Sequence, residues 1–564
     1  MFGAIFDQSG VKRIGTSGHA SLDGRSWLAG DVRLDGRAEL GALLASREAS
    51  DELLCLQAYA KWGMDFLDHL AGDFCFALWD DTSSQLICAR DQLGVRPLFY
   101  GSTKDGWLVG NSLAWISAQA GISHELDDYW IADFLSTGYS LEFERTVYRQ
   151  IHRLRPAHFL RITSAGVVVR RYWQLDVQEP VHYRDRRRYV EHFAELVARA
   201  ITDRVPADGR VGISLSGGID SSTLAVCAVD VIKDTSRVIA ETGYFEHLIP
   251  DDEQHFSALV AQRLNIAHTL RAMDDLCYDP HWRTRPIRMA EPTASVVQAQ
   301  PELAVARDMA TQASVWFFGE GPDNALMFEG REYLRWLLER RAWRQLGAAT
   351  AQYLGGRSTR DWAKFLRKCV GHGDTVEAAD EIPPWLERGL VGSLCLAERR
   401  RDVGKTDRPR HPWHPRAMAS FSDPIWQYFF DGFDRTASAA QPIKWRHPYL
   451  DLRVLGFLLS VPPIPWARHK FLLREAMRDR LPYEIVTRAK TPLAQSPLRQ
   501  SIRLHGLPAL SGGDLLLRYV NEARLPAGLP GEAELHQVIN VHALDHWLSI
   551  DRPWNPASIQ EMHA

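Results

Sequence analysis

The segment Val211–Ser222 restricts most strongly what this chain can fold into and bind. It is a short apolar run that ends in a glycine pair, an aspartate and two serines. The apolar run predicts a buried parallel strand, and the residues from Thr223 onward predict the start of a helix. Glycines at such a junction let the backbone approach an anion, and the free amides of the helix start attract negative charge. The segment therefore predicts a phosphate-binding loop, which differs from the Walker loop because no Gly-Lys-Ser/Thr follows the glycines.

Length and composition indicate an ordinary globular protein with more than one domain. The chain has 564 residues, which is too many for one hydrophobic core. Its net charge of -4 gives no broad basic face, so we expect no nucleic acid partner. No apolar run approaches the roughly 18 residues of a membrane span. The seven cysteines lack CxxC spacing, which argues against disulfides and a zinc site and predicts a cytoplasmic protein.

Two parts of the chain differ in their pattern, and the polar stretch 184–188 separates them. Short alternating runs at 74–79, 85–89 and 167–172 predict strands in the first part. A helix is expected from about residue 189 to 201, and apolar strands then alternate with helical patterns, as is typical of an open parallel sheet. Amphipathic helices dominate from about residue 325. We predict two domains, 1–183 and 189–564.

A second loop of the same form follows the strand expected at 315–318. It contains two glycines, Gly319 and Gly321, and two acids, Glu320 and Asp323. In a doubly wound sheet the ligand lies beyond the carboxyl ends of the strands, so both loops should face one site. Mg²⁺ on a triphosphate needs hard oxygen ligands, and Asp220 and Asp323 are the expected pair. Acids that only cap a helix start are the alternative for Glu320 and Asp323.

The expected ligands of the site are ATP and Mg²⁺. Backbone amides and hydroxyls of both loops should hold the nucleotide phosphates. The residues predicted to do so are Ser214, Leu215, Ser216, Gly217, Gly218, Ile219, Asp220, Ser221, Ser222, Gly319 and Gly321.

The first loop resembles the pyrophosphate loop of ATP pyrophosphatases, which release AMP and pyrophosphate. Together with four later segments it resembles the synthetase domain of the class B asparagine synthetase family; these are 319–323, 446–453, 470–475 and 481–490. Segments 70–80 and 89–100 resemble that family's N-terminal nucleophile glutaminase domain. The resemblance implies an α/β protein: an N-terminal nucleophile-type α+β sandwich, then an ATP-pyrophosphatase-type parallel sheet with a helical C-terminal part.

The first domain departs from the glutaminases that it resembles. Those enzymes use a cysteine directly after the initiator methionine, and this chain has Phe2, which carries no nucleophile. Their glutamine-holding Asn-Gly-Glu segment corresponds to Ala29-Gly30-Asp31. Two losses predict a degenerate glutaminase domain, so the amine should come from a source other than glutamine.

Relatives with a degenerate or missing glutaminase domain close rings, and among these the chain most resembles the lasso peptide cyclases. The segments that carry this resemblance are 411–415, 423–427, 444–451, 457–466 and 489–493. It implies a macrocyclase that joins a side-chain carboxylate of a leader-free core peptide to the N-terminal amine as an isopeptide. It also implies a leader peptidase and a leader-recognition protein as partners. The alternatives are a small-molecule amide or β-lactam-type synthetase, an ammonia-dependent asparagine synthetase and a non-catalytic scaffold.

Two further side chains are expected to take part in the reaction. Glu320 is expected to accept the proton of the attacking amine, at the position where the resemblance implies a base. Lys490 is expected to supply the cation opposite the pyrophosphate, which the resemblance also implies. Lys470 and Arg474 are expected on a helix surface, and the segment Ile239–Tyr244 is expected to contact adenine through its backbone.

Overall fold

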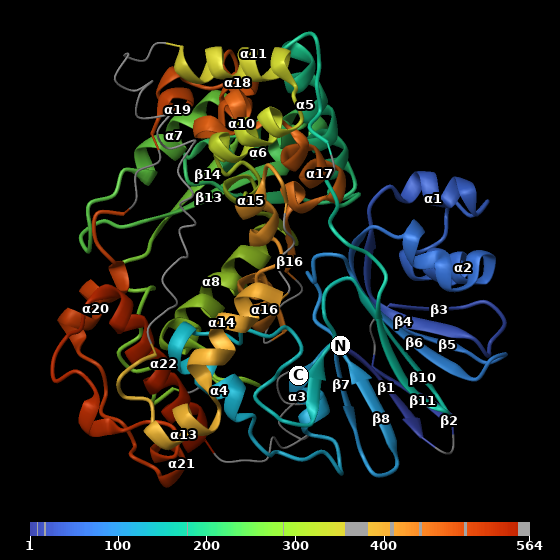
Figure 1. Cartoon of the computed structure of the whole chain (residues 1–564), viewed down its shortest axis with the longest axis vertical. Coiled ribbons are helices and arrows are strands. Elements are labelled where there is room, and N and C mark those ends of the chain that lie inside the picture. The colour runs from blue at the N-terminus through green and yellow to red at the C-terminus, as the bar shows by residue number, and fades with distance from the viewer. Residues whose placement is uncertain are drawn as a thin grey trace.

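The computed structural model describes most of the chain: residues 1–7, 10–15, 18–177, 179–285, 287–355, 382–406, 411–438, 443–489 and 493–550. Two regions of different architecture follow each other in it (Figure 1). The first consists of two antiparallel sheets with helices, and the second is built on a parallel sheet with helices around it. The predicted fold class is confirmed.

The two sheets of the first region pack face to face. Their strand orders are β2-β1-β8-β7-β9 and β11-β10-β6-β5-β4-β3. Alternate residues of β5 face opposite sides: Cys75 and Ala77 join Phe2 of β1 in one core, whereas Phe74 and Phe76 join Leu54 of helix α2 in another. The strands are Phe2–Asp7 (β1), Gly10–Gly15 (β2), His19–Ser21 (β3), Trp27–Leu34 (β4), Gly72–Asp80 (β5), Gln85–Arg90 (β6), Phe99–Ser102 (β7), Gly106–Gly110 (β8), Ile151–Arg153 (β9), His158–Thr163 (β10) and Gly166–Arg171 (β11). The first-region helices are Arg37–Leu43 (α1), Asp51–Trp62 (α2), Leu113–Ser117 (α3) and Asp128–Thr137 (α4).

The second region is a doubly wound sheet of order β14-β13-β12-β15-β16, and its strands are parallel. Helices cover both faces: Val211 and Phe317 face the core that contains α5 and α6, and Trp316 faces α8. The strands are Val211–Ser214 (β12), Val238–Tyr244 (β13), Ala267–Ala272 (β14), Val315–Phe317 (β15) and Lys444–Arg446 (β16). Helix α5 (Arg187–Thr202) precedes the first strand, and the helices between the later strands are Ile219–Ile232 (α6), Glu253–Leu264 (α7) and Ala299–Gln312 (α8). The expected strands and helices are found, and the edge strands β14 and β16 are additions to the predicted ones.

The later helices do not form a layer of their own. Helix α22 (Glu532–Ser549) packs against α4 of the first region, and the two share a core with Tyr278 and Trp385. The other helices are Pro322–Ala325 (α9), Gly330–Glu339 (α10), Trp343–Leu354 (α11), Arg388–Ser393 (α13), Leu396–Thr406 (α14), Pro415–Ser420 (α15), Ile425–Ser438 (α16), Leu452–Ser460 (α17), Phe471–Met477 (α18), Tyr483–Thr487 (α19), Pro497–His505 (α20) and Asp514–Leu517 (α21). No helix in the described part of the chain is both long and apolar enough to cross a membrane.

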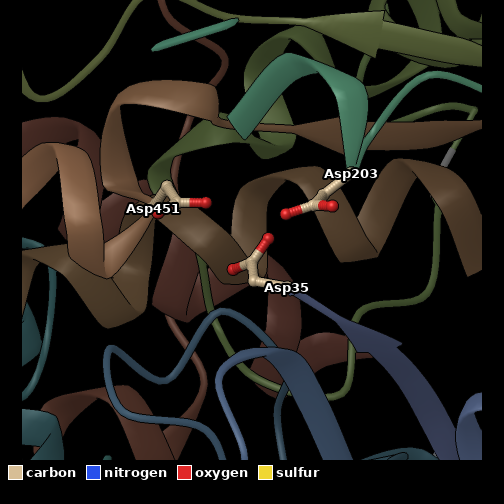
Figure 2. A group of neighbouring side chains, drawn as sticks. All are labelled: Asp35, Asp203 and Asp451. Carbon is tan, nitrogen blue, oxygen red and sulfur yellow. The ribbon is translucent and has the colours of Figure 1, made fainter. Parts of the chain in front are cut away.

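A buried charge network joins the two regions. Figure 2 shows that the carboxylates of Asp35, Asp203 and Asp451 converge, with one oxygen of each within 4.8 Å of the others. Arg204 contacts Asp35 at 2.7 Å and Asp451 at 2.9 Å, and Arg453 contacts Asp203 at 2.6 Å. The arginines supply the cations that the three acids need, so we assign the cluster to domain contact and not to a metal.

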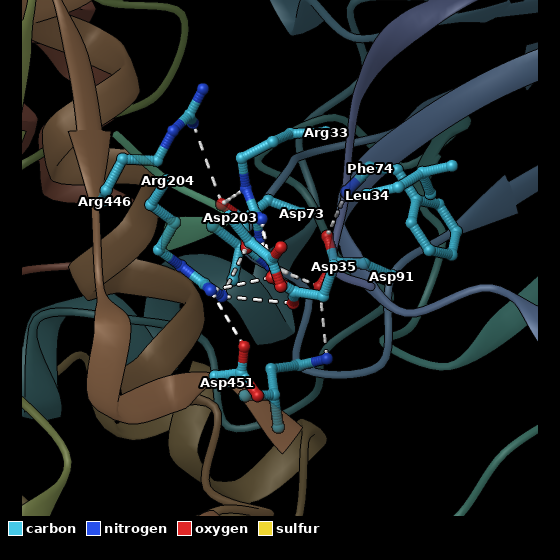
Figure 3. Close-up of polar contacts among 12 residues, drawn as sticks. Arg33, Leu34, Asp35, Asp73, Phe74, Asp91, Asp203, Arg204, Arg446 and Asp451 are labelled. Carbon is cyan, nitrogen blue, oxygen red and sulfur yellow. Dashed lines mark hydrogen bonds and ion pairs between the residues drawn. The ribbon is translucent and has the colours of Figure 1, made fainter. Parts of the chain in front are cut away.

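The same network extends into the first sheet. Arg33 binds Asp35 at 2.7 Å and Asp73 at 2.8 Å, and Figure 3 shows how these side chains meet Arg204 and Arg446. Burial opposes ionisation of Asp73, but the neighbouring arginines, Arg33 above all, hold the pKa of its carboxyl well below its usual range. Asp73 therefore stays ionised at neutral pH, and its contacts with Arg33 and Arg446 help to fix the first region against the parallel-sheet region.

Acid should destabilise the protein through two histidines of α22. Burial, with a contribution from Arg283, lowers the pKa of His542 and of His546 to about 4. In the unfolded chain both titrate near pH ~6.5. The unfolded state therefore binds more protons between these values, and the free energy of unfolding falls as the pH is lowered through that window. The double variant His542→Gln/His546→Gln should lose less melting temperature than wild type between about pH 7 and pH 5; parallel curves would contradict the assignment.

Candidate functional site

The predicted phosphate loop lies between β12 and α6. Strand β12 ends at Ser214, Leu215 donates its amide to Glu241 O at 2.9 Å, and α6 begins at Ile219. Among the described residues no side chain caps the amides at the start of α6. The hydroxyls of Ser216 and Ser221 lie 3.1 Å apart across the mouth of the loop. Open amides beside two hydroxyls form an arrangement that binds phosphate oxygens.

Two glycines allow close approaches that hold this loop in place. Gly217 has φ +66°, and a Cβ there would lie 2.6 Å from Cβ of Phe256. Gly319 of the second loop passes so near that a Cβ would lie 3.3 Å from the amide nitrogen of Ser221. The two loops, which the sequence predicts to face one site, lie in contact.

Three of the predicted phosphate-loop side chains point into the core. Leu215 is 1%, Ile219 8% and Ser222 0% exposed. The amide of Ser222 donates to Gly218 O at 3.1 Å within the helix. Leu215 and Ile219 can therefore bind a ligand only through their backbone, and Ser222 supports the loop from behind.

The structure corrects the interpretation of Lys470 as a helix-surface residue. Its ammonium contacts Asp220, and it lies 2.6 Å from Oδ1 of Asp323. Lys470 precedes α18 and has φ +55°, directly after His469 with φ +50°. This left-handed turn directs the side chain inward, where it is only 14% exposed. Helical spacing cannot predict such a turn, so the sequence does not predict Lys470 as a site residue.

Arg474 holds that turn in place and was also expected on the surface. Its Nε donates to His469 O at 2.7 Å, and its Nη2 donates to Arg488 O at 2.8 Å. Burial lowers the pKa of this guanidinium. Arg474 thus ties the Lys470 turn to the segment that leads toward Lys490.

Lys490 itself lies outside the described residues, so its proposed role stays a prediction. Arg488 shows where the segment leads: its Nη1 donates to Ser216 O at 3.4 Å. The Arg488 guanidinium also stacks 3.9 Å from the ring centroid of Phe256 and pairs with Glu253 at 3.2 Å. The chain two residues before Lys490 therefore lies against the phosphate loop.

Asp220 and Asp323 fit the role of magnesium ligands. Both carboxylates reach the ammonium of Lys470, which shows that they converge on a single cation. Carboxylate oxygens are the ligands that Mg²⁺ prefers. The hydroxyl of Tyr449 donates to the carbonyl oxygen of Asp220 at 2.9 Å and fixes the backbone on which one ligand stands.

Glu320 lies at the same edge of the sheet. Its Oε2 is 3.6 Å from Nδ1 of His447, the residue after β16. The Glu320 side chain is 36% exposed and that of His447 only 4%. A carboxylate that is partly open beside the phosphate loops can receive a proton from a substrate. His447 is not among the residues that the sequence predicts for the site.

The first region has apolar side chains where the resemblance implies glutaminase chemistry. Phe2 is 1% exposed and fills the core between the two sheets. Its amide donates to Asn111 Oδ1 at 3.0 Å. Ala29 is 2% exposed, and Asp31 pairs with Arg96 at 3.4 Å. The ring of Phe2 thus stands where a thiol is expected, the methyl of Ala29 stands where an amide is expected, and the shorter acid Asp31 is held in an ion pair.

Restoring the nucleophile alone should not restore glutamine hydrolysis. We expect Phe2→Cys, after removal of Met1, to leave glutamate release at background because Ala29 and Asp31 still lack the glutamine contacts. Loss of the buried ring should also cost about 2–4 kcal/mol of stability. Enzymatic measurement of glutamate tests this, with thermal unfolding to confirm folding. Clear glutamine hydrolysis would show that Ala29 and Asp31 do not disable the site.

A cavity of about 370 Å³ lies elsewhere, and it includes none of the predicted site residues. Its carboxylates are paired with arginines: Arg145 contacts Asp127 at 2.7 Å and Glu142 at 2.8 Å. We assign it no part in the nucleotide site. It is lined by Leu126, Asp127, Asp128, Tyr129, Glu142, Glu144, Arg145, Thr146, Tyr148, Arg149, Ile151, His152 and Leu394.

Comparison with protein families matches both regions. Residues 35–173 match the family described as glutamine amidotransferase domain, and residues 192–548 match the family described as asparagine synthase. The two loops, Lys470 and His447 all lie in the second match.

Individual relatives of this chain are named asparagine synthetase or amidase. The chain is 24% identical to asparagine synthetase (glutamine-hydrolysing) 3 of Bacillus subtilis (strain 168), over 78% of this chain and 70% of that protein. It is 24% identical to amidase chyE of Penicillium rubens, over 78% of this chain and 72% of that protein. It is 32% identical to a putative asparagine synthetase of Mycobacterium bovis, over 38% of this chain and 33% of that protein. Among solved structures, the match includes the B. subtilis glutamine phosphoribosylpyrophosphate amidotransferase with ADP and GMP, at 14% identity. The match covers 41% of this chain and 49% of that chain, and its TM-score is 0.21.

Proposed function

This chain belongs to the asparagine synthase family and is an ATP-dependent carbon–nitrogen ligase, and from that premise we propose that it is a peptide macrocyclase of lasso peptide biosynthesis. It would adenylate an Asp or Glu side chain of a leader-free core peptide and join that carbonyl to the peptide's own N-terminal amine. One observation carries the proposal: Asp220, Lys470 and Asp323 meet beside the phosphate loop, whereas Phe2 fills the place of the glutaminase nucleophile.

The first half-reaction is adenylation. A carboxylate oxygen of the substrate attacks the α-phosphorus of ATP, and the bond to pyrophosphate breaks. The amides at the start of α6 and the hydroxyls of Ser216 and Ser221 would hold the negative charge that develops on the leaving group. Lys470, on the turn before α18, would face the same phosphates. Asp220 and Asp323 would hold Mg²⁺, which neutralises phosphate charge when bound.

The second half-reaction is attack of an amine on the acyl-adenylate. The carbon–nitrogen bond forms, the carbon–oxygen bond to AMP breaks, and the amine loses one proton. Glu320 is a partly exposed carboxylate at the site and would take this proton. An amine of the same peptide, held next to the activated carbonyl, gains rate from proximity. An intramolecular amine also needs no ammonia from the first region.

Two other substrates are compatible with the same chemistry. A small-molecule amide or β-lactam-type synthetase would use the same loops with a smaller acid, and an ammonia-dependent asparagine synthetase would use aspartate. The curated relatives that match are named asparagine synthetase or amidase. Glu320 argues against the β-lactam type, because the resemblance implies a tyrosine at that position in those enzymes. The lasso-cyclase-like segments 444–451 and 457–466 favour the peptide. A leader peptidase and a leader-recognition protein remain proposed partners.

Mass spectrometry of the peptide together with AMP tests the proposal. The full chain, MgATP and the leader-free peptide encoded beside its gene should give a peptide that has lost one water and an equal amount of AMP. Two control peptides should give no ring: one with an amide in place of the acid and one with an acetylated N-terminus. Of these, only the acetylated peptide should still support adenylation. If AMP forms from aspartate and ammonia while the peptide stays unchanged, the protein is an asparagine synthetase and the macrocyclase proposal is wrong.

A further inference from the structure

His447 and Glu320 are brought together by the register of two neighbouring strands. Strands β15 and β16 pair in parallel, with Phe317 opposite Arg446. Directly after them, the amide of Phe318 donates to Arg446 O at 3.0 Å. His447 directly follows β16, and Glu320 lies three residues after β15, so both leave the sheet at the same edge. Nδ1 of His447 and Oε2 of Glu320 are 3.6 Å apart there.

Aromatic rings enclose His447 on its other sides. Its ring centroid lies 5.6 Å from those of Phe429 and Phe430 and 6.0 Å from that of Phe318. Only 4% of its side chain is exposed. Apolar walls of this kind restrict the rotation of the imidazole and exclude water from it. Nδ1 is thereby held toward Glu320.

Two buried arginines of the first region hold the helix that carries this aromatic wall. Phe429 and Phe430 lie on α16, which also carries Gln427 and Asp431. Arg153 donates to Asp431 at 2.9 Å, and Arg90 donates to Gln427. Arg90 is 0% and Arg153 4% exposed. The degenerate glutaminase region is thus connected, through α16, to the residue beside Glu320.

Glu320 has one oxygen turned toward His447 and covered. Oε2 is buried and accepts no hydrogen bond from the described residues, although the side chain as a whole is 36% exposed. The exposure therefore comes from its other atoms. At 3.6 Å, the contact with Nδ1 is slightly too long for a hydrogen bond. Such contacts commonly tighten when substrate binds.

We propose that His447 is a positioning residue for Glu320: it binds Oε2 and so presents Oε1 to the attacking amine. This inference rests on the proposed function, because it concerns the proton that the amine loses. As the carbon–nitrogen bond forms and AMP leaves, that proton passes to Glu320 Oε1. A carboxylate that is free to rotate would meet the amine in fewer of its conformations, so His447 should affect amide formation and leave adenylation unchanged.

Two substitutions of His447 separate positioning from packing. His447→Asn keeps a donor close to the position of Nδ1, whereas His447→Leu has a similar volume and no donor. We expect the Leu variant to close the ring at least about tenfold more slowly and the Asn variant to recover most of that loss. Acyl-adenylate, trapped as the hydroxamate by hydroxylamine, should form at the wild-type rate in both. Equal ring-closure rates for Asn and Leu, or loss of the hydroxamate, would overturn the positioning role.

A double variant and a matched control complete the test. Glu320→Gln/His447→Leu should be no slower than Glu320→Gln alone, because His447 acts through Glu320; additive losses would contradict this. His536→Leu serves as the control, since His536 lies 3.7 Å from Glu532 in an exposed pair on α22. It should close the ring at the wild-type rate, and a loss equal to that of His447→Leu would overturn the assignment.

A measurement without substrate separates this inference from the proposed function. In protein labelled with nitrogen-15 at histidine, the ring signal of His447, identified by its loss in His447→Asn, should shift on Glu320→Gln. An unshifted signal would overturn the pairing whatever the substrate is. If the signal shifts but wild type makes no AMP with the peptide, the macrocyclase proposal fails and the pairing stands.

Discussion

Lys470→Met is expected to lower AMP formation by about a hundred- to a thousandfold while the protein stays folded. The ammonium of Lys470 is the charge that the structure places between Asp220 and Asp323, beside the amides of the phosphate loop. Removing one preorganised donor to a developing negative charge costs that much in comparable sites. Without Lys470 the site also loses a positive charge near the phosphates, so the affinity for ATP should fall.

The same experiment compares Lys470 with Lys490. Initial rates of pyrophosphate release should be measured for Lys470→Met, Lys490→Met and Lys444→Met, with melting temperatures for each. Lys444 is an exposed lysine at the start of β16, whereas the site lies beyond the end of that strand, so Lys444 serves as the matched control. If Lys470→Met keeps full activity while Lys490→Met loses most of its pyrophosphate release, Lys490 alone supplies the cation.

Asp220→Asn and Asp323→Asn should each abolish detectable AMP formation, a loss of at least about a thousandfold. Each substitution removes one of the two carboxylates that converge on a cation. Neither acid is deeply buried, with side-chain exposures of 18% and 49%. Their loss should therefore change the melting temperature of the ligand-free protein little. MgATP should raise the melting temperature of wild type and of neither variant.

Asp230→Asn is the matched control for the acid substitutions. Asp230 stands on the same helix as Asp220 and pairs with Arg480 at 2.6 Å, with 45% of its side chain exposed. It should keep wild-type activity and the MgATP shift. A large loss of stability in Asp220→Asn or Asp323→Asn would instead indicate a structural role for the pair with Lys470.

Local pattern was sufficient to predict the loops of the site. A buried strand, a glycine turn and a helix follow each other within Val211–Ser222, and the same order recurs from Val315 to Asp323. Parallel strands bring their carboxyl ends to one edge, so the meeting of the two loops follows from the fold class. That meeting is confirmed by the contact of Gly319 with Ser221.

Residues that reach the site through irregular backbone could not be predicted in this way. Lys470 depends on a left-handed turn at 469–470, and His447 depends on the edge strand β16, which is only three residues long. Neither feature has a periodicity. The run Arg468-His469-Lys470 is one available signal, because three basic residues interrupt the apolar pattern just before α18.

The division of the chain shows a further limit of sequence patterns. The domain boundary near residue 183 stays a prediction from the sequence. The structure adds a core in which α4 packs on α22, and a charge network in which Arg204 joins Asp35 to Asp451. These contacts join residues hundreds of positions apart, and only the folded chain brings them together. They connect the first region to the region that contains the ligase site.

Transfer of a heavy oxygen isotope from the substrate to AMP tests the central claim most directly. The leader-free peptide, labelled with heavy oxygen in its acidic side chain, is incubated with MgATP and the full chain, and both products are analysed by mass spectrometry. If the carboxylate attacks the α-phosphorus and the peptide's own amine then displaces AMP, AMP carries one heavy oxygen and the peptide becomes a ring that has lost one labelled oxygen as AMP forms. Unlabelled AMP, or ADP with labelled phosphate, would contradict an AMP-forming macrocyclase.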